Sequence, residues 1–160
     1  MVTIKGTKQE SARDVKLIGR KYKDGSHWGE WWSKGLFDIL EKLPNVSSLN
    51  DNGYIGLMQS GEDGFEYWIG MFFESGTDAP EGFEELYIES AEFEVFYLCG
   101  SEESGELFGD VPHRLCVSKL FEEQLSEKKG GICFERYNCP RYTTPDENGK
   151  VILDYAIELE

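Results

Sequence analysis

An order of strand, helix, strand and strand occurs twice along this chain, and this repeat constrains the fold more than any other feature of the sequence. Apolar residues at every second position predict strands, and apolar residues every three to four positions predict helices. In the first half these patterns fall at residues 15–22, 28–43, 54–59 and 65–74. In the second half the same order falls at residues 92–98, within 106–125, and at 132–138 and 150–159.

Two such units pair most simply into one continuous antiparallel sheet with both helices packed on one face, which is an α+β fold. The seam along which the halves meet is then a natural groove for a ligand. We expect a single domain over residues 14–160, with repeats at about 14–75 and 84–160. Residues 1–13 are polar, and we expect them to form a flexible N-terminus.

Capping and turn residues set the limits of several predicted elements. Ser26 is expected to cap the first helix, which then runs without a break until Pro44 ends it. The glycine-rich segment at residues 60–64 predicts a hairpin loop between two strands. Pro112 is compatible with the second helix only near its start.

Charge is distributed unevenly along the chain. The 31 Asp and Glu residues outnumber the 16 Lys and Arg residues, which gives a net charge of −15. Between Lys42 and Arg114 there are sixteen acidic residues and no Lys or Arg. Such a field repels nucleic-acid phosphates and anionic membranes and concentrates cations near the protein, although it also serves solubility. We therefore expect no direct nucleic-acid binding and no membrane partner.

The cysteines and the N-terminal sequence indicate a cytoplasmic protein without a bound metal. Cys99, Cys116, Cys133 and Cys139 form no CxxC pair, and the two histidines do not stand near them at zinc-ligand spacing. We therefore expect no metal and no cofactor. The polar N-terminal sequence contains no cleavable signal, transmembrane run or lipidation motif, so reduced cysteines in the cytoplasm are expected.

The predicted strand at residues 133–137 is the most informative segment for chemistry. Alternation places Cys133, Glu135 and Tyr137 on one face, and it places Phe134 and Arg136 on the other. A carboxylate in an apolar strand is costly to bury unless it is paired. Glu135 is therefore either an ordinary surface residue of the sheet or a buried carboxylate that attracts a ligand cation.

Aromatic residues make up 14% of the chain, which is generous for a core of this size. In the predicted strand FEYWIGMFF, at residues 65–73, Trp68 and Gly70 share a face, and the glycine leaves a gap for a flat ligand beside the indole. Aromatic faces attract cations and stack on planar compounds, whereas core packing is the alternative for each ring taken singly. Further ring surface comes from Trp28, Trp31, Trp32, Tyr54, Tyr97 and Tyr155.

No signature of a common enzyme class occurs in the sequence. The motifs GxSxG, GxGxxG and HExxH and the P-loop are all missing. His27 and His113 have no nucleophile partner that can be identified from the sequence, and we interpret both as structural or solvent-facing. Motifs therefore assign no catalytic residue.

Three segments resemble the GyrI-like small-molecule-binding domain, which is also the effector-binding half of AraC-type and MerR-type multidrug regulators. They are KLIGRKYKDGSHWGEWWSKGLFDIL, IESAEFEVFYLCG and FERYNCPRYTTPDENGKVILDYAIEL, and the resemblance spans residues 15–159. The second segment resembles an IPAGxYAVF run of the family. The third resembles its FExY strand followed by a final xYIPI.

The resemblance implies a duplicated βαββ fold with a ligand groove at the pseudo-twofold seam. By its position in the FExY strand, Glu135 matches the glutamate that binds lipophilic cations in the family, with Tyr137 on the same face. Tyr67 matches the tyrosine in the strand that closes the first half. The ligand-binding residues expected from this resemblance and from the aromatic pattern are Glu135, Tyr137, Tyr67, Trp68, Phe93, Tyr155 and Trp32.

The sequence also departs from the family pattern. Phe93 stands where the family prefers a tyrosine, so a hydroxyl is missing there. The run Ala156-Ile157-Glu158 replaces the usual Ile-Pro pair, so the final strand can continue differently. No helix-turn-helix segment is present, which indicates a stand-alone module rather than a complete transcription factor.

The sequence leaves three functions open. The first is a multidrug-binding protein that senses or sequesters planar, hydrophobic and often cationic compounds, with a role in transcription regulation or drug resistance. The second, implied by the resemblance, is hydrolysis of reactive cyclopropane-bearing genotoxins, in which Glu135 would be the catalytic carboxylate. The third, also implied by the resemblance, is an interaction with DNA gyrase, in which the acidic surface mimics DNA. The sequence indicates neither the physiological ligand nor the oligomeric state.

Overall fold

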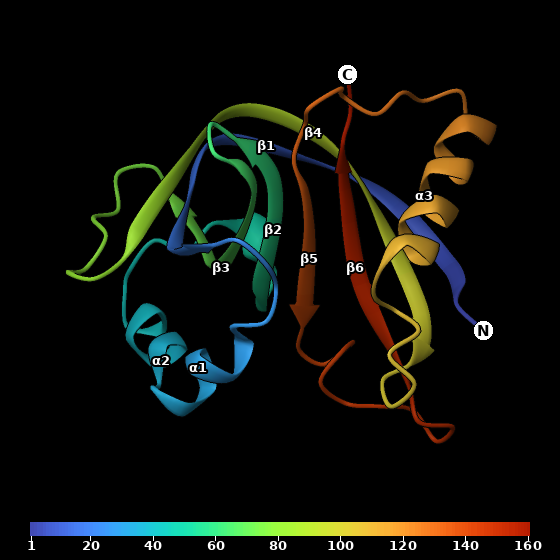
Figure 1. Ribbon diagram of the computed structural model, residues 1–160, viewed down its shortest axis with the longest axis horizontal. Coiled ribbons are helices and arrows are strands. Elements are labelled where there is room, and N and C mark those ends of the chain that lie inside the picture. The colour runs from blue at the N-terminus through green and yellow to red at the C-terminus, as the bar shows by residue number, and fades with distance from the viewer.

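The computed structural model, which describes residues 1–160, is a six-stranded antiparallel sheet with helices packed on its outer face (Figure 1). The first half contributes β1 (Thr3–Tyr22), α1 (Trp28–Ser33), α2 (Leu36–Glu41), the short 3₁₀ helix η1 (Ser48–Asn50), β2 (Gly53–Gly61) and β3 (Gly64–Glu74). The second half contributes β4 (Glu84–Ser101), α3 (Asp110–Glu122), β5 (Cys133–Asn138) and β6 (Lys150–Glu158). The predicted α+β fold, with its repeated order of elements, is confirmed.

The sheet closes into a barrel in the strand order β1-β3-β2-β5-β6-β4, with β4 next to β1. The two halves meet along two seams, because β2 pairs with β5 and β1 pairs with β4. The second part of β1 also pairs with β3, so this strand lies between both halves. The sequence predicted a continuous sheet but not its closure, because closure depends on the full lengths of β1 and β4.

The N-terminal segment differs from the frayed chain that its polarity predicted. From Thr3 onward it belongs to β1 and pairs with β4, from Thr3 opposite Cys99 to Arg13 opposite Ser90. Most side chains before Ala12 are exposed or half-buried and polar, so the apolar alternation that marks a strand is missing. The backbone hydrogen bonds to β4, and not an apolar pattern, make this segment a strand.

The first helical region is interrupted, whereas the sequence predicted one continuous helix. Gly35 adopts a φ of 64° between α1 and α2, a left-handed conformation that glycine tolerates because it has no Cβ. Ser26 does not cap α1, because its hydroxyl donates to Asp24 and the residue before the helix is His27. In α3, Pro112 lies in the first turn, as predicted. None of these helices combines the length and apolar character that a membrane span needs.

Alternation along the strands divides their side chains between the barrel interior and the outer face. The interior holds an apolar cluster that includes Leu17, Ile55, Trp68, Phe72, Phe93 and Phe134. On the outer face, α1 and α2 pack on β1 and β3, and α3 packs on β4 and β6. Figure 1 shows β2 and β5 between these two helical regions. The helices therefore flank the seam between the halves.

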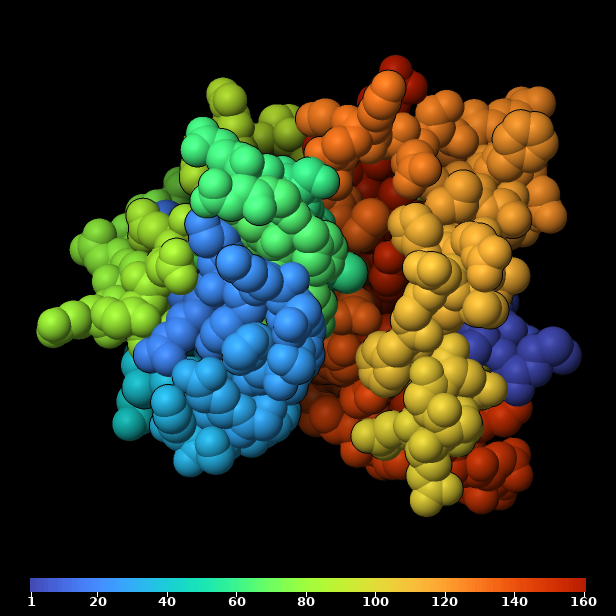
Figure 2. All heavy atoms as spheres, in the orientation of Figure 1, coloured from blue at the N-terminus to red at the C-terminus, as the bar shows by residue number.

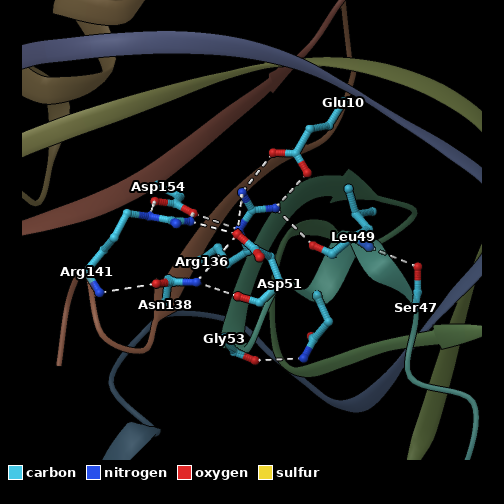
Figure 3. A network of polar contacts seen from close by, with 10 residues as sticks. Glu10, Ser47, Leu49, Asp51, Gly53, Arg136, Asn138, Arg141 and Asp154 are labelled. Carbon is cyan, nitrogen blue, oxygen red and sulfur yellow. Dashed lines mark hydrogen bonds and ion pairs between the residues drawn. The ribbon is translucent and has the colours of Figure 1, made fainter.

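A network of charged side chains lies inside the barrel beside the apolar cluster (Figure 3). Arg136 of β5 is fully buried and donates two hydrogen bonds to Glu10, at 3.1 and 2.8 Å, and one to Asp154, at 2.8 Å. It also donates to the carbonyl oxygen of Leu49 at 2.9 Å. A buried guanidinium is tolerated only when its charge is paired and its donors are bonded, and both conditions are met here.

Candidate ligand-binding site

A cavity of about 840 Å³ opens on the outer face of the barrel, at the seam where β2 pairs with β5. Figure 2 shows the surface hollowed along the line between the first half, in blue and green, and the second half, in yellow to red. The start of α1 and the loop before it form one side, and the connections from β4 to α3 and from β5 to β6 form the other. Side chains of β2, β3 and β5 form the floor.

Aromatic rings and carboxylates line this cavity, and no Lys, Arg or His does. The rings are those of Trp28, Trp32, Tyr54, Phe65, Tyr67, Phe108, Tyr137 and Tyr142. The carboxylates are those of Asp24, Glu102 and Glu135. The walls are therefore largely apolar, and the charge that faces the cavity is negative.

Glu135 is the buried acid of this set, with 8% of its surface exposed. The hydroxyl of Tyr67 donates to its Oε1 at 2.7 Å, and the hydroxyl of Tyr137 donates to the same oxygen at 3.2 Å. The indole N–H of Trp28 donates in turn to the Tyr67 hydroxyl at 3.0 Å. Both phenols bind Oε1. Oε2 accepts no hydrogen bond from the protein, and no basic side chain pairs with this carboxylate.

This environment shifts the pKa values of Glu135 and of the two phenols that contact it. Burial raises the pKa of Glu135, and the hydrogen bonds from Tyr67 and Tyr137 lower it by less. Burial and the nearby carboxylate raise the pKa of both phenols, so they remain protonated and continue to donate. A carboxylate in this position is stabilised in its charged form by two neutral donors and lacks a cation.

A glycine in β2 makes room for the contact between Tyr67 and Glu135. A Cβ placed on Gly56 would lie 2.3 Å from the Tyr67 hydroxyl and 3.0 Å from Oε1 of Glu135. Any larger residue would therefore displace one partner or the other. Glycine within an otherwise apolar strand often marks such a close approach, and this was the available sequence signal.

The rings of the cavity contact one another mainly edge to face. Tyr137 is central, with ring centroids 4.8 Å from those of both Trp28 and Tyr142 in T-shaped geometry. Trp32 packs edge-on against Tyr54 at 5.4 Å and is 59% exposed at the rim. Such packing fixes the ring planes and leaves π faces available to a bound molecule.

Four of the seven predicted ligand-binding residues line this cavity, namely Glu135, Tyr137, Tyr67 and Trp32. Trp68 and Phe93 do not, because both side chains point into the barrel interior and belong to its apolar cluster. Tyr155 lies on the outer face beneath α3, where its hydroxyl contacts Nδ1 of His113 at 2.7 Å. The structure therefore separates these three residues from the cavity lining.

The predicted gap beside Trp68 is filled by backbone. A Cβ on Gly70 would lie 2.2 Å from the carbonyl oxygen of Ile18, and one on Gly19 would lie 1.9 Å from that of Ile69. These facing glycines allow β1 and β3 to approach closely in the barrel. Gly70 therefore serves strand packing and provides no space for a ligand.

Several lining residues were not predicted from the sequence. Phe108 and Tyr142 lie in connections that have no regular periodicity, so no pattern marks them as facing a common cavity. Asp24 and Glu102 follow the ends of β1 and β4, at corresponding places in the two repeats. The repeat in the sequence could have predicted that these two loops face the same cavity, because they occupy corresponding positions in the two halves.

Comparison with solved structures identifies proteins with a similar fold. No protein-family model matches the chain, and no curated protein matches it in sequence. The structure is similar to that of SAV2435 bound to tetraphenylphosphonium, with a TM-score of 0.71 and 18% identity, over 97% of this chain and 94% of that one.

Two further solved structures are similar. A candidate bacterial transcription regulation protein from Staphylococcus aureus MU50 matches with a TM-score of 0.66 and 18% identity, over 97% of this chain and 98% of that one. EcmrR in complex with DNA matches with a TM-score of 0.56 and 6% identity, over 97% of this chain but 57% of that one. The chain therefore has the GyrI-like fold that its sequence resemblance implied.

Proposed function

We propose that this protein binds lipophilic aromatic cations in the cavity at the β2–β5 seam, and that it senses or sequesters such compounds. The observation that carries this proposal is Glu135, a buried carboxylate without a cationic partner in a cavity lined by rings. The similarity to SAV2435, which binds the aromatic cation tetraphenylphosphonium, supports it. The similarity to a candidate transcription regulation protein supports a sensing role.

A flat or propeller-shaped cation fits this chemistry better than a neutral compound. Aromatic faces attract a desolvated cation by about 2 kcal/mol or more each. A unit charge about 4 Å from a carboxylate gains about 4 kcal/mol at an effective dielectric constant of about 20. Part of that gain is offset by the desolvation of the ligand, so we expect Glu135 to contribute about 2 kcal/mol, or about 30-fold in Kd.

The test is a calorimetric titration with two compounds of nearly equal shape, methyltriphenylphosphonium and the neutral triphenylphosphine oxide. We expect Glu135→Gln to weaken the phosphonium about 30-fold and to change the oxide by no more than about twofold. Glu89→Gln, at an exposed position of β4, removes the same charge outside the cavity and serves as the matched control. Absence of phosphonium binding by the wild type, or an equal loss for both compounds, would contradict the proposal.

A second candidate function is hydrolysis of reactive cyclopropane-bearing genotoxins, and one feature favours it. A carboxyl whose pKa is raised by burial and which contacts two protonated phenols is suited to activate water as a general base. Incubation with such an electrophile, followed by mass spectrometry, distinguishes the two functions. Turnover that is lost in Glu135→Gln would establish the enzyme, and an unchanged compound would leave binding as the function.

A further inference from the structure

One wall of the cavity is built from a connection that has no strand or helix of its own. Tyr142 and Thr143 line the cavity, and both lie between β5 and β6. Two backbone bonds tie the wall to the neighbouring strands: the N–H of Tyr142 donates to the carbonyl of Asn138 at 2.8 Å, and that of Ile152 donates to the carbonyl of Arg141 at 3.0 Å. Beside them, the N–H of Thr144 donates to the carbonyl of Pro140 at 3.0 Å, and the N–H of Arg141 donates to Oδ1 of Asn138 at 3.2 Å. Most of these bonds lie within the connection or at the end of β5, so they leave the wall with little rigidity of its own relative to the barrel.

The side chain of Arg141, next to Tyr142, fixes this wall to the barrel (Figure 3). Its Nε and Nη2 donate to both oxygens of Asp154, at 3.1 and 2.6 Å. Nη2 also donates to Asp51 at 2.7 Å, and the guanidinium lies 5.2 Å from the centre of the Tyr97 ring. A planar guanidinium bound on two sides and stacked on a ring has one orientation, so the backbone that carries it is oriented too.

The anchor point is shared with the strand that carries the buried glutamate. Asp154 is fully buried and accepts from Arg141 and also from Arg136, the neighbour of Glu135 in β5. Asp154 therefore positions both the wall, through Arg141, and the strand that carries Glu135 in the floor, through Arg136.

Arg141 can be removed without leaving that carboxylate unpaired. Asp154 keeps its bond from Arg136, and Asp51 is exposed enough to be solvated by water. Loss of Arg136 would instead leave Glu10 without its ion-pair partner. The fold therefore tolerates a variant at position 141 better than one at position 136.

We propose that Arg141 is a positioning residue for ligand binding, which holds the Tyr142–Thr143 wall against bound aromatic compounds and so sets how tightly their rings are enclosed. This rests on the proposed binding function. Because Arg141 acts through the wall and not through charge, cationic and neutral ligands depend on it equally. That dependence distinguishes it from Glu135, which acts on cations alone.

The test combines affinity with a measurement that needs no ligand. We expect Arg141→Ala to weaken methyltriphenylphosphonium and triphenylphosphine oxide alike by about tenfold, roughly the cost of ordering one residue again on binding. Arg141→Lys restores part of this loss through Asp154. Arg114→Ala removes the same charge from an exposed position of α3 without an ion pair, and it leaves both affinities unchanged.

A double-mutant cycle with Tyr142→Ala identifies the route of the effect. If Arg141 acts through the wall, Arg141→Ala causes no further loss once the Tyr142 ring is gone. Hydrogen–deuterium exchange of the free protein should rise at residues 139–149 in Arg141→Ala and stay unchanged in the helices. Any of four results would overturn the inference. They are unchanged exchange in Arg141→Ala, an unchanged affinity, a loss of affinity for the phosphonium alone, and a loss of full size in the Tyr142→Ala background. Absence of phosphonium binding by the wild type would instead refute the proposed function, while the exchange measurement would still report on the wall.

Discussion

Replacement of Arg136 by methionine tests how much of the stability depends on the charge network inside the barrel. The network contains three acids, Glu10, Asp51 and Asp154, against two bases, Arg136 and Arg141. Arg136→Met removes four hydrogen bonds and leaves Glu10, which is mostly buried, without a cation. Removing one partner of a buried ion pair costs about 3–5 kcal/mol, and methionine preserves much of the apolar stem.

A loss of about 4 kcal/mol is large enough to measure by two methods. With a urea slope of about 2 kcal/mol/M, the midpoint of unfolding falls by about 2 M. In a chain of this length each kcal/mol lost from the free energy of unfolding lowers Tm by about 2–4 °C, so Tm falls by about 8–16 °C. The matched control is Arg13→Met, which breaks an exposed pair with Glu92 and should cost less than about 1 kcal/mol.

A second variant assigns the loss to the uncompensated acid. Glu10→Gln combined with Arg136→Met removes the orphaned charge, so we expect the double variant to be more stable than Arg136→Met alone. If Arg136→Met costs no more than Arg13→Met, the buried network contributes little and the reasoning is refuted. If the double variant is less stable than the single one, the orphaned charge is not the cause of the loss.

Three further predictions concern Glu135 and the close approach of strands. Because burial raises the pKa of Glu135 and its charged form stabilises a bound cation, phosphonium affinity should fall below that pKa by up to about tenfold per pH unit and by about 30-fold in all, and Glu135→Gln should show a flat profile in the same titrations. A folded-state pKa above the unfolded value contributes stability below about pH 4.3 that is lost as pH rises through the folded-state pKa. Glu135→Gln should therefore stabilise the protein against urea more at about pH 8 than at about pH 5, and the opposite order would show that the carboxyl is not penalised by burial. Gly70→Ala should cost at least about 2 kcal/mol, since its Cβ meets backbone at 2.2 Å, whereas Gly29→Ala, whose Cβ meets nothing within 4 Å, should stabilise α1 by about 0.5–1 kcal/mol in thermal unfolding.

Local patterns in the sequence predicted the elements better than their faces. Alternation correctly divided β5 into a face with Glu135 and Tyr137 and a face with Phe134 and Arg136. It could not decide which face of β3 is interior, because both faces of a closed sheet are covered by apolar groups here. Trp68 was therefore expected in the cavity although it lies in the barrel.

The remaining differences come from tertiary contacts that leave no local pattern. The first part of β1 is polar and is a strand only because β4 offers it a pairing edge. Tyr142 and Phe108 reach the cavity from irregular connections, where position depends on anchors such as Arg141. Two missed features had a local signal: Gly35, since glycine inside a predicted helix often marks its end, and Gly56, since glycine within an apolar strand often marks a close approach.

The pairing of β1 with β4 has a consequence for how the chain reaches its native state. These partners are distant in sequence, from Thr3 with Cys99 to Gly19 with Glu84, so the ladder cannot form until both repeats are available. Contacts of this kind slow folding, because the entropy of closing a long loop is lost before the contacts form. Neither repeat can complete its sheet alone, and the seam that carries the cavity closes the same ring as the β1–β4 seam. We therefore expect the two halves to unfold together in one cooperative transition, with the cavity present only when the whole ring is closed.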